Sequence, residues 1–148
     1  EVAESAQSER RQMVGSGRGV EETELENKAA GTQAEEYVAD QVGGERTPNE
    51  WYDVLGPYGE KIEVKSTSEE YASGRRGRFR LWRDQHDRLI QDGGTYWFLV
   101  DGLPTVRMDA REVSELLDRE SLEWTGSGRH GMESEQVKIP WNYVIDPD

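Results

Sequence analysis

Three residues in the middle of the chain have the types and spacing needed to bind a divalent cation beside a phosphodiester. The run Lys61-Ile-Glu-Val-Lys65 alternates polar and apolar residues, so a strand would place Glu63 and Lys65 together on one face. Asp53 precedes this run and can approach Glu63 if the two segments pair as a hairpin. Two carboxylates suit a hard cation such as Mg²⁺, and a nearby lysine can position water or offset charge on phosphorus.

The flanking segments predict the elements that would hold these residues in place. Trp51–Leu55 and Lys61–Lys65 are β-favouring runs joined by Gly-Pro-Tyr-Gly, so we expect an antiparallel hairpin. Apolar residues at helical spacing predict a helix from Glu24 to Val42, which the pair Gly43-Gly44 would end. The catalytic candidates would then lie on a hairpin that follows a helix.

The second half of the chain predicts a mixed sheet flanked by helices. Thr95–Val100 is a continuous apolar run, typical of a strand covered on both faces, and we expect it in the interior of the sheet. The other predicted elements are a polar loop over 69–80, a helix over Trp82–Gln91, a strand over Thr105–Met108, a helix capped by Asp109 and ending near Arg119, and an edge strand or hook in the segment 137–145. This order is typical of the α/β class.

The motif alone has little specificity, because an acid two residues before a lysine also occurs in Glu26-Asn-Lys28 on the predicted first helix. The context of Glu63 and Lys65 is much rarer. It combines an upstream Asp53 at hairpin distance, an apolar strand and a helix that carries Gly31-Thr-Gln-Ala-Glu35. Taken singly, each residue could instead belong to a turn or to an exposed charged face, where an ion pair contributes about 0 to 1 kcal/mol.

With these motifs, residues 24–100 resemble the PD-(D/E)XK nuclease superfamily, and within it the archaeal Holliday-junction resolvases and restriction endonuclease-like nucleases. The resemblance implies a restriction endonuclease-like fold, with a mixed central β-sheet flanked by helices. Tyr52 stands where the proline of the family name would be, and the region after residue 101 matches no member. The residues that the resemblance implies are Glu35, Asp53, Glu63 and Lys65 for catalysis, and Asp53, Glu63 and Val64 for a bound Mg²⁺ or Mn²⁺.

Two neighbouring positions compete for the role of the helix acid. The glycine spacing favours Glu35 over Glu36, and a shift of one residue turns a helix position by about 100 degrees. The resemblance also suggests polar contacts to water or phosphate from Ser66 and from Gln85, which lies on the next predicted helix.

One dense basic segment follows the candidate catalytic strand. Phe79 and Trp82 lie among its arginines, and their rings could stack on unpaired bases. Arginine forks match phosphate oxygens, although the segment could equally be a solvated loop that neutralises nearby acids. The residues predicted to bind nucleic acid are Arg75, Arg76, Arg78, Arg80, Arg83 and Gln85.

The charge balance is strongly acidic, with 31 acidic and 18 basic residues and a net charge of −13 over 148 residues. Acidity ordinarily indicates a partner other than nucleic acid. At about 1 M salt, however, the Debye length is only about 3 Å, so distant charges hardly reach a DNA-binding face. Because the acids are spread along the chain and lysine is scarce, we favour adaptation to high salt over an acidic interaction protein.

The remaining composition excludes some kinds of site and argues against a membrane span. The absence of cysteine excludes disulfides and thiolate chemistry, and no apolar run is long enough for a membrane span. Lone histidines such as His86 and His130 are more often structural than metal-binding. We expect a flexible leader over 1–22, a single nuclease-like domain over 23–148 and a cytoplasmic location.

The functional hypothesis is an endonuclease that hydrolyses DNA with magnesium-activated water. The resemblance also implies a homodimer, because such nucleases often cut two strands. A first alternative is a catalytically inactive nuclease-fold subunit that only binds nucleic acid. A second alternative is an acidic interaction protein, in which Glu35, Asp53, Glu63 and Lys65 would not converge.

Overall fold

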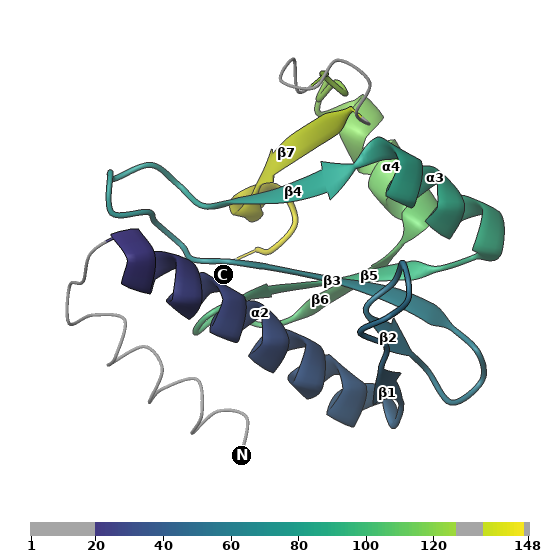
Figure 1. The fold of residues 1–148 in the computed structure, drawn as a ribbon. Coiled ribbons are helices and arrows are strands. Elements are labelled where there is room, and N and C mark those ends of the chain that lie inside the picture. Colours follow the sequence, from purple (N-terminus) through teal and green to yellow (C-terminus); the bar gives the residue numbers. More distant parts are fainter. Residues whose placement is uncertain (1–19, 127–134, 147–148) are drawn as a thin grey trace.

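The computed structural model describes residues 20–126 and 135–146 and contains a mixed sheet with helices on both of its faces (Figure 1). The elements in chain order are α2 (Val20–Val42), β1 (Glu45–Arg46), β2 (Val54–Leu55), β3 (Lys61–Thr67), β4 (Arg78–Trp82), α3 (Arg83–Asp92), β5 (Thr95–Val100), β6 (Val106–Asp109), α4 (Ala110–Arg119), β7 (Gln136–Pro140) and the 3₁₀ turn η1 (Trp141–Tyr143). The expected α/β fold is confirmed.

The main sheet has five strands in the order β1-β2-β3-β5-β6. β3 pairs antiparallel with β2 and parallel with β5, while β6 returns antiparallel beside β5. The predicted hairpin and the interior position of β5 are therefore both confirmed. The first hairpin strand is shorter than expected, because only Val54 and Leu55 of the run 51–55 are assigned to β2.

Each face of this sheet has its own hydrophobic core. α2 packs Ala34 and Val38 against Ile62 and Val64 of β3, which point to one face. The other face is covered by α3, α4 and the strands β4 and β7, and its core is larger. Glu63 lies in register with Tyr96 of β5, which belongs to this second core. The alternation of β3 thus sends its apolar residues towards α2 and Glu63 towards α3.

β4 and β7 form a separate two-stranded antiparallel sheet. The sequence interpretation was wrong in placing Arg78 to Arg80 in a loop, since they belong to β4. The edge strand expected in the C-terminal segment is present as β7. Phe79 of β4 and Ile139 of β7 face each other in register, and both are buried. Two short amphipathic strands, far apart in sequence, satisfy each other's backbone groups in this sheet.

The helix boundaries lie close to the predicted ones. α2 begins at Val20 rather than Glu24, while the predicted leader otherwise lies outside the described residues. α4 begins after Asp109, whose side chain accepts the N3 amide while Glu112 accepts the Asp109 amide, as a capping box requires. Among the described helices, none is both long and apolar enough to cross a membrane.

Candidate active site

The site begins at an open edge of β3. β2 pairs with β3 only at Lys61 and Ile62, whereas β5 pairs with β3 from Ile62 to Thr67. The Asp53 amide donates to the Ile62 carbonyl at 3.0 Å. After Ile62 no β2 residue pairs with β3, and the Asp53 carboxylate takes the place of a strand partner. Its Oδ2 accepts the Val64 amide at 2.9 Å. The brevity of β2 therefore leaves the β3 edge free and holds Asp53 against it.

Glu63 and Lys65 lie side by side on the α3-facing side of β3. Lys65 Nζ is 3.2 Å from Glu63 Oε2, and their side chains are only 15% and 6% exposed. Ser66 follows on the opposite side of the strand and is exposed. The alternation seen in the sequence thus places a carboxylate and an ammonium together at the open edge, but it does not bring in Ser66.

Gln85 of α3 connects β3 to the loop before β2. Its Nε2 donates to Glu63 Oε1 at 3.0 Å and to the Trp51 carbonyl at 2.7 Å. Both amide hydrogens are therefore used within the protein. The resemblance predicted that Gln85 contacts water or phosphate. In the structure its side chain instead orients the Glu63 carboxylate.

Glu35 approaches from α2, on the other face of the sheet. Its Oε1 accepts a hydrogen bond from Arg46 Nε at 3.0 Å, and its pKa is raised by burial and then by the nearby charge of Asp53. Glu36 is exposed and lies on a different side of α2. The structure therefore brings Glu35 rather than Glu36 towards the Asp53 side of the site.

The carboxylates of the site are difficult to ionise without a cation. Burial raises the pKa of Glu63 to about 8, an effect that Lys65 opposes and Asp53 reinforces. Burial also raises the pKa of Asp53, although the Val64 amide and the Lys65 charge lower it. Burial, together with the charge of Asp53, raises the pKa of Glu35 as well. Three acids with raised pKa values at one edge form a place where positive charge would be stabilised.

The oxygen atoms at this edge fit a hard divalent cation. Asp53 and Glu63 are close enough for their carboxyl groups to hydrogen-bond to each other. Val64 can supply only its carbonyl, and this carbonyl points to the Asp53 side, as does the Val64 amide. Within residues 20–126 and 135–146, no three acidic or histidine side chains could hold a metal by themselves. Two carboxylates and one carbonyl suit Mg²⁺, which commonly binds one or two carboxylates and keeps several water ligands.

The predicted nucleic-acid-binding arginines lie along the segment that leads from β3 through β4 to α3. Arg75, Arg76, Arg80 and Arg83 are exposed, and Arg78 is half-buried. Arg83 is paired with Glu135 at 2.5 Å. Phe79 cannot stack on a base, because it is buried against Phe98 with a ring-centroid distance of 4.8 Å. The strand alternation directs the arginines outward and Phe79 inward.

His86 belongs to the core rather than to the site. Its Nδ1 lies 2.9 Å from the Tyr96 hydroxyl, and its Nε2 lies 2.8 Å from Ser114 Oγ. Burial lowers the pKa of His86 despite the nearby Asp87 charge. The structural role expected for a lone histidine is what the contacts indicate, whereas His130 lies outside the described residues.

Three residues near the site were missed by the sequence interpretation. Arg46 pairs with Glu35, and the Arg88 guanidinium lies 4.5 Å from the centre of the Trp51 ring. Arg88 comes three residues after Gln85, so helical spacing could have placed both on one side of α3. No local signal could have found Arg46 or Trp51, since each depends on contacts between distant segments.

The sheet with helices on both faces is a restriction endonuclease-like α/β fold, and its open strand edge carries the acids and the lysine. The sequence model of the PD-(D/E)XK nuclease superfamily domain matches residues 21–146, so the chain belongs to this superfamily. Its members are typically nucleases and generally use divalent metals such as Mg²⁺ or Mn²⁺. No curated protein matches the chain.

Proposed function

We propose that this protein is a metal-dependent DNA endonuclease whose catalytic residues are Glu35, Asp53, Glu63 and Lys65. The observation that carries the proposal is the convergence of Asp53, Glu63 and Lys65 at the free edge of β3. These residues come from two separate segments, and their position is unfavourable for the isolated protein, because burial raises the pKa of both acids and the charge of Asp53 raises that of Glu63 further. Such an arrangement is typical of a functional site.

Asp53, Glu63 and the Val64 carbonyl would hold Mg²⁺ or Mn²⁺ in this proposal. When bound there, the cation would polarise a phosphoryl oxygen and lower the pKa of a water ligand. Gln85 keeps Glu63 Oε1 oriented through its 3.0 Å hydrogen bond. Glu35 adds negative charge near Asp53 from the opposite face of the sheet.

Lys65 supplies the positive charge that the phosphate chemistry needs. Its ammonium is held 3.2 Å from Glu63 and is mostly shielded from solvent. From this position it can orient the attacking water or offset negative charge that develops on phosphorus. A buried ammonium is more effective in this role than an exposed one, since water screens it less.

The outward-facing arginines before and within β4 would bind the DNA backbone. They follow β3 directly, which favours a path of the substrate from the catalytic edge along residues 75–83. The net charge of −13 opposes DNA binding at low ionic strength. We therefore propose that the protein works at high salt, where the general repulsion is screened and close arginine contacts remain.

Cleavage assays test this function directly. The protein would be incubated with Mg²⁺ or Mn²⁺ and with branched, linear and single-stranded DNA over a range of salt concentrations. Asp53→Ala, Glu63→Ala and Lys65→Ala should each abolish cleavage by the parent protein. Preference for four-way junctions would place the protein with resolvase-like nucleases, and cleavage of both strands by a dimer would support the implied homodimer.

The alternative function is an inactive nuclease-fold subunit that binds nucleic acid. It predicts DNA binding without turnover at any salt concentration, and unchanged DNA affinity in the three alanine variants. Metal binding separates the two functions, because an active nuclease needs a cation at Asp53 and Glu63. In either case we propose one folded domain over residues 23–148.

A further inference from the structure

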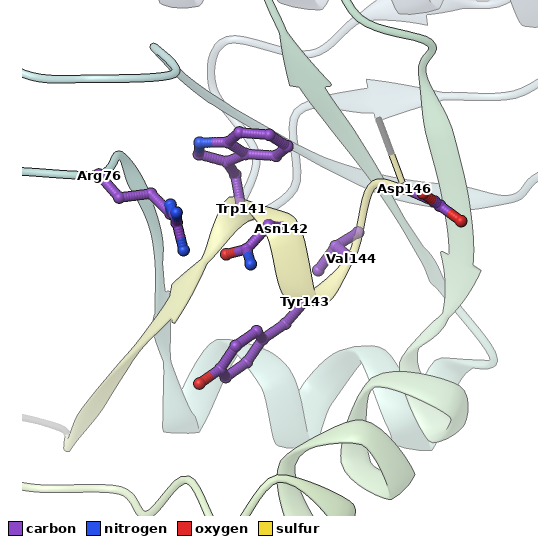
Figure 2. A pocket seen from close by; sticks show the side chains of 6 residues that line it. All are labelled: Arg76, Trp141, Asn142, Tyr143, Val144 and Asp146. Atoms are coloured by element: carbon purple, nitrogen blue, oxygen red, sulfur yellow. The ribbon is translucent and has the colours of Figure 1, made fainter. Parts of the chain in front are cut away.

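A hollow of about 390 Å³ lies beside η1, at the end of the arginine segment. Figure 2 shows Arg76 and Tyr143 near one another on one side of η1, while Asp146 lies on the other side. No residue of the hollow belongs to the proposed catalytic set. Its lining consists of Arg76, Trp141, Asn142, Tyr143, Val144 and Asp146.

The hollow is fastened to the loop that follows the catalytic strand. The Trp141 amide donates to the Gly77 carbonyl at 3.1 Å, and Trp141 Nε1 donates to the Glu69 carbonyl at 2.9 Å. The Gly77 amide also donates to Glu69, and a Cβ at Gly77 would lie 1.7 Å from the Ser68 carbonyl oxygen. This close approach needs glycine, so the wall of the hollow is held in a fixed position relative to the end of β3.

The side chains of the hollow match the chemistry of a nucleobase. Tyr143 is 42% exposed, although most large hydrophobic side chains of the described structure are covered. Its ring offers a surface for stacking, and the exposed Asn142 amide offers both donors and acceptors to a base edge. Arg76 is exposed at the rim, where its guanidinium can contact a phosphate.

The charge distribution favours a base over a phosphate inside the hollow. Asp146 lies in the lining and would repel a phosphate group, whereas the neutral base carries no charge. Arg76 lies on the opposite side of η1 from Asp146 (Figure 2), so its guanidinium can contact a phosphate away from this carboxylate. In a duplex both faces of each base are covered by its neighbours, so only an unpaired base can present a face to Tyr143.

We propose that this hollow binds one unpaired nucleotide of the DNA substrate, with its base against Tyr143 and its phosphate at Arg76. The proposal rests on the function proposed above and specifies its substrate as DNA with a single-stranded segment near the cut. Lys65 and Glu69 are four residues apart, which corresponds to at most about 14 Å of extended chain. Because the Glu69 carbonyl accepts the Trp141 indole N–H, the hollow adjoins the end of this stretch, which favours an unpaired nucleotide on the same strand a short distance from the cleaved bond.

Binding without metal tests the hollow independently of cleavage. Fluorescence anisotropy would measure the affinity of the full chain for a labelled single-stranded oligonucleotide and for the matching blunt duplex at one salt concentration. Tyr143→Ala should weaken single-strand binding about tenfold, since stacking on one aromatic residue contributes that much, and should leave duplex binding unchanged. Arg76→Ala should weaken both.

Two control variants match these substitutions. Tyr58→Ala removes a tyrosine that is 91% exposed but lies in the β2–β3 turn, and Arg107→Ala removes an exposed arginine on β6. Neither control should change single-strand affinity by as much as twofold. Equal single-strand affinity of the parent and Tyr143→Ala, or an equal loss in Tyr58→Ala, would overturn the proposal.

Cleavage supplies the second readout. The parent should cut DNA with a single-stranded flap about tenfold faster than blunt duplex at subsaturating substrate, and Tyr143→Ala should lose this preference while still cutting duplex. Single-strand binding through Tyr143 without any cleavage would refute the nuclease and leave the hollow supported. Cleavage with no preference for flaps in the parent would refute the hollow and leave the nuclease supported.

Discussion

Two buried polar clusters adjoin Tyr96, and they differ in how well their polar atoms are satisfied. In one cluster, His86 has a hydroxyl partner at each ring nitrogen, from Tyr96 and Ser114. In the other, Glu63 is 5% exposed and lies against a second carboxyl group, that of Asp53. Both clusters are polar and buried, but only the second contains like charges that oppose each other.

The His86 cluster therefore stabilises the fold, whereas the Glu63 and Asp53 cluster is unfavourable to it. Neutral groups with complete hydrogen bonds are tolerated in a core. Neighbouring acids with raised pKa values are tolerated only where something else requires them. Burial raises the pKa of Tyr96 and the negative charge of Glu63 raises it further, so the two clusters are electrostatically connected. The substitutions below should affect the two clusters in opposite ways.

The largest expected effect is on cleavage. Lys65→Ala should reduce the cleavage rate by about 100-fold or more, because a positioned charge at the reacting phosphate is lost. Lys61→Ala is a matched control on the same strand. Lys61 is not part of the proposed site, and its Nζ lies 2.7 Å from Asp92 Oδ2. It should retain most of the activity. Initial rates at saturating Mg²⁺ compare the two variants, and equal rates would exclude a catalytic role for Lys65.

The next effect is a gain in stability. In metal-free protein at pH 8 or above, Glu63→Gln should stabilise the fold on the order of 2 kcal/mol, since it removes a buried charge beside Asp53. The pKa of Glu63 is raised to about 8, so its folded form favours the proton, and stability falls as pH rises from about 4.5 to 8. Urea unfolding across this range should show the decline in the parent but not in Glu63→Gln.

Mg²⁺ provides the internal control for this result. Excess Mg²⁺ should raise the unfolding free energy of the parent by RT ln(1 + [Mg²⁺]/Kd), where Kd is the dissociation constant for Mg²⁺. The unfolding free energy of Glu63→Gln should not rise. If Glu63→Gln instead destabilises the metal-free protein at alkaline pH, the Glu63 and Asp53 cluster is not electrostatically unfavourable.

The histidine cluster should respond in the opposite direction. His86→Ala should destabilise the protein by about 1–3 kcal/mol at pH 7, because Tyr96 and Ser114 lose their shared partner in the core. Thermal or urea unfolding measures this loss. Ser66→Ala, at an exposed position of β3, is the control and should change stability by less than about 0.5 kcal/mol.

The smallest expected effect is on how stability falls at acidic pH. Burial lowers the pKa of His86, so the folded protein keeps the imidazole neutral. The stability that neutral His86 contributes is therefore lost as pH falls from the unfolded-state pKa of about 6.5 towards the lower pKa of the folded state. The groups that face it are Tyr96, Ser114 and the Trp124 ring, with Asp87 nearby. His86→Gln should reduce the loss between pH 7 and 5 by about 1 kcal/mol. An unchanged pH profile would show that His86 does not titrate on unfolding.

The sequence was most informative where structure follows a local period. The alternation in Lys61–Lys65 correctly placed Glu63 and Lys65 on one face, and the apolar run Thr95–Val100 correctly indicated an interior strand. Asp109 correctly indicated the start of α4, because an N-cap residue acts on amides only a few positions further along the chain. In these cases the physical cause lies within one element.

The sequence was least informative where the partner is distant. Arg78–Trp82 alternates as a strand does, but the polar, arginine-rich composition of residues 69–80 suggested a loop, and its partner β7 lies far along the chain. The same distance hid the contact of Arg46 with Glu35 and the hollow formed by Arg76 and Tyr143. Contacts between remote segments have no local signature, so neither propensity nor period could reveal them.

Parallel titrations of metal binding and cleavage test the central claim most directly. Mn²⁺ binding by the parent would be followed by electron paramagnetic resonance while DNA cleavage is measured in the same buffer. We predict a common midpoint for binding and activation, and loss of both in Asp53→Asn and Glu63→Gln. Cleavage without any divalent cation, or Mn²⁺ binding that survives both substitutions, would contradict the account.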